Sequence, residues 1–220
     1  MPTDPHTHRH ARIRGWVLPS VLVMVTLVAL GGLVSTRQLW LQEQMLKAET
    51  QRMRNRAWAQ AALTTALQDV QAPEMSIDGQ AHLRQQMGDP NATHVFYPHT
   101  LAQHDVLRAR LAGAPCREGI CISDNAAPTP LAAWAERSAQ AQRVDASQWP
   151  DGAASAWYWV EVLVYAPDET DRAAQARFFY RITAWAQGSL PGARAVLQAV
   201  WQRDAQADTG RWLSWQWLTP

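Results

Sequence analysis

The stretch WVLPSVLVMVTLVALGGLVST, Trp16–Thr36, contains no charged residue in 21 positions. An α-helix needs about 20 predominantly apolar residues to cross the hydrocarbon core of a bilayer, so this stretch predicts one transmembrane span. A secretory signal has a shorter apolar core that ends at a cleavage site of small residues. Gly31, Gly32 and Ser35 imitate such a site, but polar helical sequence follows them at once. We therefore expect the stretch to be retained as an anchor.

The charges beside the span indicate its orientation. Arg9, Arg12 and Arg14 lie immediately before it, and bacterial inner-membrane proteins keep such clusters in the cytoplasm. The other side also carries cations, beginning with Arg37 and Lys47. The orientation is therefore indicated mainly by how closely the first three arginines border the span. This pattern predicts a single-pass inner-membrane protein with its C-terminal part in the periplasm.

Helical sequence continues beyond the span. Gln38–Ala72 contains no glycine or proline and is rich in good helix formers. Leu39, Leu46 and Met53 recur at intervals of seven, which places them along one stripe of a helix. Pro73 then ends the pattern, because proline disfavours helix in the residue before it. The sequence predicts one long helix whose second half is amphipathic and periplasmic.

The remainder reads as a globular domain of the α+β class. Residues 74–152 are rich in turn-forming residues, with one short helix expected near residues 130–143. Four strands are then predicted from apolar or alternating sequence: Trp157–Tyr165, Arg177–Gln187, Ala193–Gln202 and a short one at Arg211–Leu218. Late consecutive strands after an early helix predict an antiparallel C-terminal sheet packed on that long N-terminal transmembrane and amphipathic helix, through Arg54–Ala72.

Tryptophans are concentrated on these strands. Those at strand spacing are predicted to lie mostly in the core: Trp157, Trp159, Trp185 and Trp201. Those of the last strand fit either a core position or a protein interface, where aromatic residues are enriched, and the core is favoured: Trp212, Trp215 and Trp217.

Several function classes are disfavoured. The net charge of +1, without a clustered basic face, argues against nucleic-acid binding. No G-x-S-x-G, H-E-x-x-H or phosphate-binding glycine motif occurs, so we expect neither an enzyme nor a cofactor.

His94, His99 and His104 are five residues apart, which scatters them around a helix, and we interpret them as surface residues rather than metal ligands. The acidic run at 168–171 lacks the ligand spacing of a calcium loop and is read as a solvated turn.

The chain has two cysteines, Cys116 and Cys121. Two thiols are too few for a structural zinc site, which takes about four ligands. In an exported domain the pair would instead form a local disulfide, so the compartment decides the interpretation. With a periplasmic domain, we predict the disulfide and no metal.

The N-terminal residues resemble a known family. A short basic leader ending in glycine, RHARIRG at Arg9–Gly15, is followed directly by the apolar run, as in type IV prepilins. The resemblance implies that a prepilin peptidase cuts between Gly15 and Trp16 and that Trp16 is methylated; phenylalanine is commoner at that position. Major pilins carry glutamate where this chain has Ser20. That difference is similar to the tip-proximal K/X type of minor subunit, which has no predecessor to pair with.

The C-terminal residues resemble PilX-type pilus assembly proteins. The resemblance rests on YRITAWAQGSLPGARAVLQAVWQR (Tyr180–Arg203), GRWLSWQWL (Gly210–Leu218) and the loop CREGIC (Cys116–Cys121). Residues 74–149 otherwise resemble nothing that assigns them a role.

These resemblances imply a division of the chain and a function. The segments would be a prepilin leader (1–15), the transmembrane half of the helix (16–36), its periplasmic amphipathic half (37–72) and a pilin domain (73–220). The protein would be a minor pilin that primes or caps type IV pilus assembly at the inner membrane and ends near the tip of the surface filament. Neighbouring helices would pack against Ser20, Leu39, Leu46 and Met53.

The implied partners are other minor pilins, the major pilin, the prepilin peptidase, the inner-membrane assembly platform and a large tip adhesin. Two alternatives remain open at this stage. One is a minor pseudopilin of a type II secretion system, although K-type subunits have a larger domain with calcium loops. The other is an unrelated single-pass inner-membrane protein with a periplasmic interaction domain.

Overall fold

A computed structural model of the chain describes residues 17–72, 82–86, 93–123, 131–144, 155–165, 177–188, 193–203 and 209–218. The chain divides into two compact units, Met1–Glu49 and Thr50–Pro220. A single helix, α1 (Val17–Gln71), contributes to both. It ends one residue before the position predicted from Pro73, so the prediction of one long helix is confirmed.

The N-terminal unit consists, in its described part, of the first half of α1. This half is long and apolar enough to cross a membrane by length and composition, and none of its most apolar window is buried within the protein. The hydroxyl groups of Thr26, Ser35 and Thr36 form hydrogen bonds inside the helix. Thr26 donates to the carbonyl of Leu22 at 3.0 Å, and Ser35 donates to that of Gly31 at 2.9 Å. Such internal bonds are what a polar side chain needs where no water is present.

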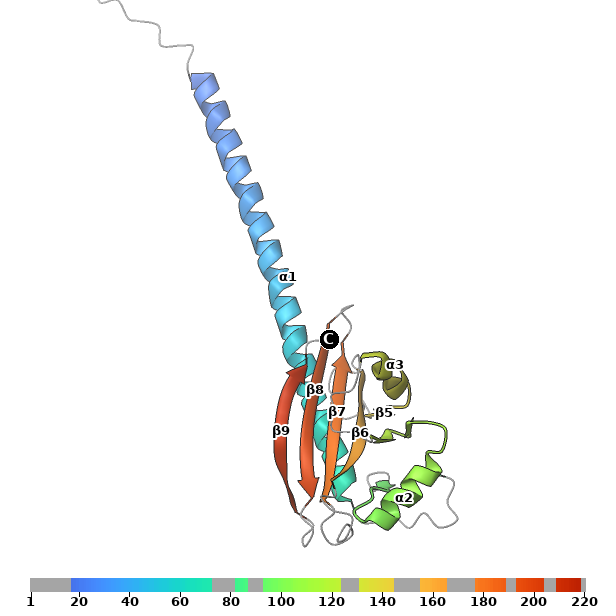
Figure 1. The fold of residues 1–220 in the computed structure, drawn as a ribbon. Coiled ribbons are helices and arrows are strands. Elements are labelled where there is room, and N and C mark those ends of the chain that lie inside the picture. The colour runs from blue at the N-terminus through green and yellow to red at the C-terminus, as the bar shows by residue number, and fades with distance from the viewer. Residues whose placement is uncertain are drawn as a thin grey trace, which may run out of the picture. The chain divides into compact units, whose positions relative to one another are not determined.

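The second unit is built on one large sheet with strand order β3-β4-β6-β7-β8-β9 (Figure 1). Its strands are β3 (Cys116–Arg117), β4 (Ile120–Ile122), β6 (Ser155–Tyr165), β7 (Arg177–Gln187), β8 (Arg194–Arg203) and β9 (Gly210–Leu218). A further short strand, β5 (Gln142–Arg143), also pairs with β6, and β1 (Arg84–Gln86) and β2 (Thr93–Val95) form a separate two-stranded sheet. The four strands predicted from the sequence are therefore β6 to β9, within two residues of the expected bounds.

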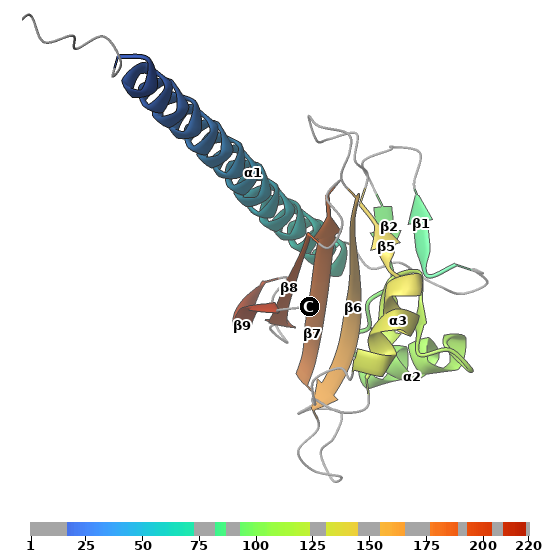
Figure 2. The ribbon, with the colours of Figure 1, turned by 90° about the horizontal axis from the view of Figure 1, so that it is seen from above.

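Two short helices lie beyond β6, at the opposite side of the sheet from β9 (Figure 2). They are α2 (Leu101–Arg110) and α3 (Leu131–Ala139). Strands β6 to β9 pair antiparallel in chain order, whereas β4 pairs parallel with β6. The architecture is thus an α+β fold with a mostly antiparallel C-terminal sheet and a long N-terminal helix, as predicted.

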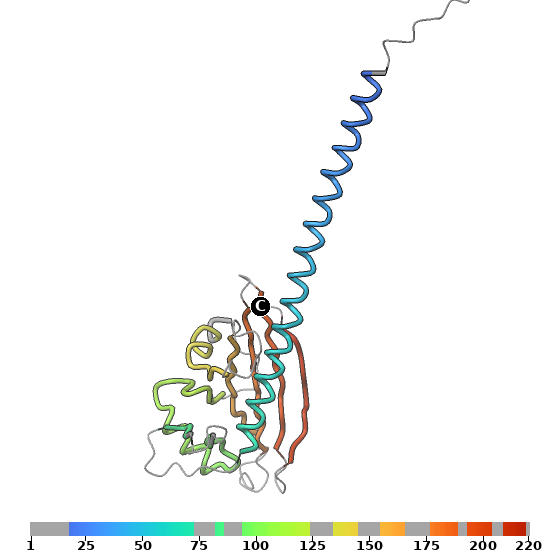
Figure 3. Tube along the Cα trace, turned by 180° about the vertical axis from the view of Figure 1, so that it is seen from behind, coloured from blue at the N-terminus to red at the C-terminus, as the bar shows by residue number. Residues whose placement is uncertain are grey.

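The main core lies between α1 and one face of the sheet, which Figure 3 shows from the helix side. Ala59, Ala62 and Ala66 are fully buried on α1, and their small side chains let the helix backbone approach the strands. From the sheet, this core receives alternate residues of β7 and β8, including Tyr180 and Leu197. The alternation predicted from the sequence therefore places the expected side chains against the helix.

Polar contacts anchor α1 at both ends of this interface. Near its start in the unit, the buried amide of Asn55 donates to the carbonyl of Ala193 at 2.9 Å. Gly188 lies so close that a Cβ there would be 1.8 Å from the Gln51 side chain, so only glycine fits without a shift. Near the end of α1, Asp69 binds Arg84 at 2.6 Å.

Three expectations about the fold were wrong. Helix α2 was not predicted, although Thr100 and Gln103 form a capping box that begins it. His104 on α2 is buried against Phe178, so it is not a surface residue. The core assignment also fails for Trp212 and Trp215, which are 42% and 51% exposed, because both lie on the edge strand β9.

Candidate functional site

The residues predicted to pack against neighbouring helices all lie on α1 with exposed side chains. Ser20 is exposed near its start, and Leu39, Leu46 and Met53 are 65%, 69% and 62% exposed. From Leu18 to Glu49 every residue of α1 is exposed. An apolar helical surface of this extent is stable only in lipid or against other helices. The predicted cleavage residues Gly15 and Trp16 lie outside the described residues.

The two cysteines form the disulfide predicted from the sequence. Cys116 and Cys121 face each other across the antiparallel hairpin of β3 and β4, with their Cα atoms 4.1 Å apart. Both residues are buried, and they pack with Trp159 of β6 in a second, smaller core. Trp134 of α3 meets the ring of Trp159 edge-on, with centroids 5.2 Å apart. The disulfide therefore belongs to the packing of α3 against the sheet.

The turn inside the disulfide loop has a demanding geometry. Glu118 and Gly119 both adopt positive φ, 54° and 79°, which is the signature of a two-residue type I′ hairpin. A Cβ on Gly119 would be 2.9 Å from the Cβ of Gln142, so this position needs glycine. The Glu118 carboxylate accepts from the backbone N–H of Leu83 and contacts His82, each at 2.9 Å. These contacts tie the hairpin to the segment that leads into β1.

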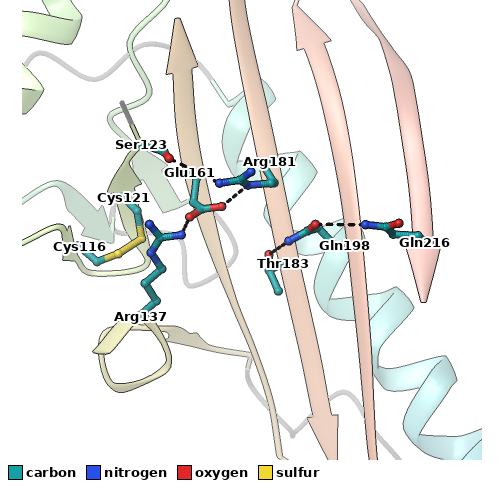
Figure 4. Close-up of polar contacts among 9 residues, drawn as sticks. All are labelled: Cys116, Cys121, Ser123, Arg137, Glu161, Arg181, Thr183, Gln198 and Gln216. Carbon is teal, nitrogen blue, oxygen red and sulfur yellow. Dashed lines mark hydrogen bonds and ion pairs between the residues drawn. A yellow bond between two sulfur atoms is a disulfide. The ribbon is translucent and has the colours of Figure 1, made fainter. Parts of the chain in front are cut away.

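A row of side chains crosses the sheet next to this hairpin (Figure 4). Cys121 of β4 is paired with Glu161 of β6, and Glu161 with Arg181 of β7. Glu161 is fully buried and forms ion pairs with both Arg137 of α3 and Arg181. Arg181 also donates to the hydroxyl of Ser123, which follows β4, at 3.5 Å. One carboxylate thus joins α3, β6 and β7.

The polar row continues toward β9. Gln198 of β8 donates to the hydroxyl of Thr183 at 3.1 Å, and Gln216 of β9 donates to the amide oxygen of Gln198 at 3.4 Å (Figure 4). Thr183 and Gln198 are buried. Directed bonds of this kind fix the strand register, because a slip by one residue would remove every one of them.

Burial shapes the electrostatics of this cluster. Burial lowers the pKa of Arg137, and the neighbouring charge of Arg181 lowers it further. Burial also lowers the pKa of Arg181. Guanidinium groups nevertheless stay charged in proteins, so two cations share one buried carboxylate. This arrangement suits a structural clamp, since removing Glu161 would leave both arginines buried without their counter-ion.

The sequence shows only part of this cluster. Glu161 is the one charged residue in its apolar strand, and Arg181 lies on the more polar side of an alternating strand. Arg137 of the short helix is not among the residues predicted to form a site. The sequence nevertheless indicated that a further cation was needed. A buried carboxylate such as Glu161 in a central strand requires cations beside it, and Arg181 of β7 approaches it from one side only.

No group of three or more potential metal ligands occurs among the described residues. His94 and His99 are partly buried on β2 and the segment after it, and His104 is on α2. The acidic run at 168–171, expected to be a solvated turn, lies outside the described residues.

The last strand carries an exposed apolar strip. Trp212, Leu213 and Trp215 are between 42% and 51% exposed. Trp212 pairs with Trp201 and Trp215 with Ala199, and both partners point into the core against α1. The register shifts between these pairs, so Leu213 is an extra residue in a β-bulge, and the bulge keeps both tryptophans on the helix side.

The fold defines a class of protein. Its members have an exposed apolar helix whose second half packs on the antiparallel sheet of a C-terminal domain. Residues 117–203 match the family model described as type IV pilus assembly protein PilX C-term. The match spans the described strands β4 to β8 together with α3. Residues 117–203 are therefore similar to the C-terminal domain of PilX-type pilus assembly proteins. Neither a curated protein nor a solved structure gave a significant match.

The match covers all or most of two of the three stretches that resemble PilX-type proteins in sequence. It includes Tyr180–Arg203 and most of the cysteine loop, and it ends before Gly210–Leu218. The clamp residues Arg137, Glu161 and Arg181 all lie within it. The similarity therefore points to a type IV pilus component.

Proposed function

We propose that the protein is a minor pilin that primes or caps the type IV pilus, with α1 embedded among the helices of other subunits and the sheet domain near the filament tip. The observation that carries this proposal is the combination of an exposed apolar α1 with a PilX-type domain in one chain. It acts by assembly and not by catalysis.

Ser20 supports the minor role. A glutamate at this position in major pilins is thought to pair with the N-terminal amine of a neighbour already in the filament, and a hydroxyl cannot form that ion pair. A carboxylate in the membrane is costly unless a partner neutralises it. A subunit with serine there needs no predecessor, which suits the first subunit of a filament. Its partners are then other minor pilins, the major pilin and the assembly platform of the inner membrane.

The periplasmic side of the proposal depends on the disulfide and the leader. The Cys116–Cys121 bond is stable in an oxidising compartment and rare in the cytoplasm. Prepilin processing behind Gly15 would leave α1 as the start of the mature chain. Both features support a sheet domain that is periplasmic before assembly and part of the surface pilus afterwards.

The experiment is a deletion of the gene combined with quantitative shearing of surface pili. The proposal predicts few pili of normal diameter in the deletion strain, and a protein far less abundant than the major pilin in sheared filaments of the parent. Near-equal abundance would make it a bulk subunit. Normal pilus number with impaired protein secretion would indicate a type II pseudopilin, and normal behaviour in both assays would indicate an unrelated membrane protein.

A further inference from the structure

The open edge of β9 carries an inference that goes beyond filament assembly and does not depend on it. Strand β9 ends the order of the large sheet, and no described strand pairs with its outer edge (Figure 1). Its last part, SWQWL at Ser214–Leu218, contains no proline and no charged residue, which are among the usual devices that protect an edge from pairing. The bulge at Leu213 interrupts the edge and leaves Ser214–Leu218 as a regular stretch.

The side chains beside Ser214–Leu218 are of the types that are enriched at protein-binding surfaces. Trp215 is 51% exposed, and its ring centroid is 5.8 Å from that of Trp217. The guanidinium of Arg56 on α1 lies over the ring of Trp217, 5.5 Å from its centroid. Tryptophan and arginine are the residues that dominate binding energy at protein interfaces. They lie together here because α1 and β9 are neighbours on this face (Figure 3).

The charges around β9 indicate whether a second copy of this chain or an acidic partner protein would bind at its edge. In the second unit, α1 from Thr50, β8 and β9 carry one acidic residue, Asp69, which is bound to Arg84. The same elements carry six arginines: Arg52, Arg54, Arg56, Arg194, Arg203 and Arg211. Two aspartates in the connection 204–208 leave arginine in excess. A second copy of this chain would bring like charges together, whereas an acidic partner would be attracted.

We propose that Ser214–Leu218 binds an extended acidic segment of a partner protein by strand addition. The segment hydrogen-bonds to the outer backbone edge of β9. Its alternate apolar side chains lie beside Trp215 and Trp217, and a carboxylate approaches Arg56. Main-chain bonds supply affinity in this mode of recognition, and the side chains supply specificity.

The test uses the full-length protein in detergent micelles and a synthetic peptide, acetyl-Glu-Val-Glu-Val-Thr-Val-Glu-amide. Peptide binding is followed by fluorescence anisotropy, and backbone protection is followed by amide hydrogen exchange. The proposal predicts saturable binding that weakens with salt, together with slower exchange at Ser214–Leu218. A peptide with two central prolines cannot complete the ladder and should not bind. A peptide with lysine in place of glutamate should bind at least tenfold more weakly, because its charge is reversed.

Matched variants assign the contacts. Trp215→Ala should weaken binding about tenfold or more, as truncation of an aromatic anchor does. Tyr165→Ala removes another exposed aromatic residue, 58% exposed on β6, and should leave affinity unchanged. Arg56→Gln should weaken binding a few-fold and reduce its salt dependence, unlike Arg143→Gln on β5. The thermal midpoint of each variant shows whether it is folded.

Three results would overturn the proposal. The first is no binding of the acidic peptide. The second is binding that Trp215→Ala leaves unchanged, or that does not protect Ser214–Leu218 from exchange. The third is self-association of the protein through β9, seen as a doubled mass that Trp215→Ala abolishes, because that would make a second copy the occupant. Each of these outcomes can occur whether or not the protein is a minor pilin.

Discussion

Arg181 of β7 lies directly opposite Glu161 of β6, and its Nε donates to the Glu161 carboxylate in the buried interior of the sheet domain. The same carboxylate binds Arg137 of α3, and its strand neighbour on the other side is Cys121 of the disulfide. The hairpin, α3 and the central strands are thus connected through one side chain. Loss of this carboxylate should loosen the part of the domain that matches the PilX family.

The first prediction concerns this clamp. Glu161→Gln should destabilise the domain by about 3–5 kcal/mol, because two buried arginines lose their counter-ion. Chemical denaturation followed by tryptophan fluorescence measures the change. Asp105→Asn, at an exposed position on α2, is the control and should change stability by less than about 0.5 kcal/mol. A Glu161→Gln protein as stable as the control would show that the clamp does not hold the domain.

The second prediction concerns the disulfide. Replacing Cys116 and Cys121 together by serine should lower the free energy of unfolding by about 2 kcal/mol, at the low end for disulfides because the closed loop is short. The fold should persist, since the type I′ turn and the contacts of Glu118 remain. Thiol titration of the denatured, unreduced periplasmic protein should find no free thiol. Two free thiols would refute the bond in the cell and favour a cytoplasmic domain.

The third prediction is a loss of stability at alkaline pH. Burial raises the pKa of Tyr180 to about 12, and it also raises the pKa of Tyr97 and Tyr158. A phenol whose pKa is higher in the folded state favours folding fully below its unfolded pKa of about 10. This contribution is lost as the pH rises from about 10 toward 12. Thermal midpoints measured between pH 8 and 12 should therefore fall steeply above pH 10.

Tyr180 also donates its hydroxyl to the carbonyl of Pro98 at 2.8 Å, which supplies a specific check. Tyr180→Phe removes one ionisable group and one hydrogen bond, so it should cost about 1 kcal/mol at neutral pH. The difference from the parent protein should shrink as the pH rises above 10. Parallel curves for the two proteins at all pH values would contradict the assignment.

The fourth prediction concerns the exposed face of α1. Leu46→Asp should reduce surface piliation strongly, because it would bury an uncompensated charge between neighbouring helices. The helix itself should form, since aspartate costs less than about 1 kcal/mol of helix propensity. Leu46→Met keeps the surface apolar and is the control. Normal piliation with Leu46→Asp would show that Leu46 does not contact neighbouring helices during assembly.

Ser20→Glu should not improve piliation, as expected of a subunit that needs no predecessor.

The sequence predicted those elements whose pattern is local. The length of α1 follows from an uninterrupted run of helix formers closed by Pro73, and β6 to β9 follow from apolar or alternating runs separated by turn residues. The parallel pairing of β4 with β6 was not predictable in this way. It joins residues about forty positions apart, and the three residues of β4 are too few to show a period.

The candidate site was predicted only in part, for a similar reason. The uncharged apolar run predicted the exposed apolar helix, and the expected periplasmic location of the domain predicted the disulfide. Arg137 was missed because its partner Glu161 is reached only when α3 folds over the sheet. The exposure of Trp212 and Trp215 was misjudged because a final strand looks the same in sequence whether or not a helix covers it. In the structure, β9 is an edge strand and carries a bulge.

The measurement that tests the central claim most directly is the intact mass of the mature protein from cells with an active prepilin peptidase. A pilin-type subunit loses residues Met1–Gly15 and begins at a methylated Trp16, and Gly15→Leu should block this step. Co-expression without the peptidase is the control and should give the uncut chain. A mature protein that still begins at Met1 when the peptidase is active would contradict the assignment of this chain as a pilin subunit.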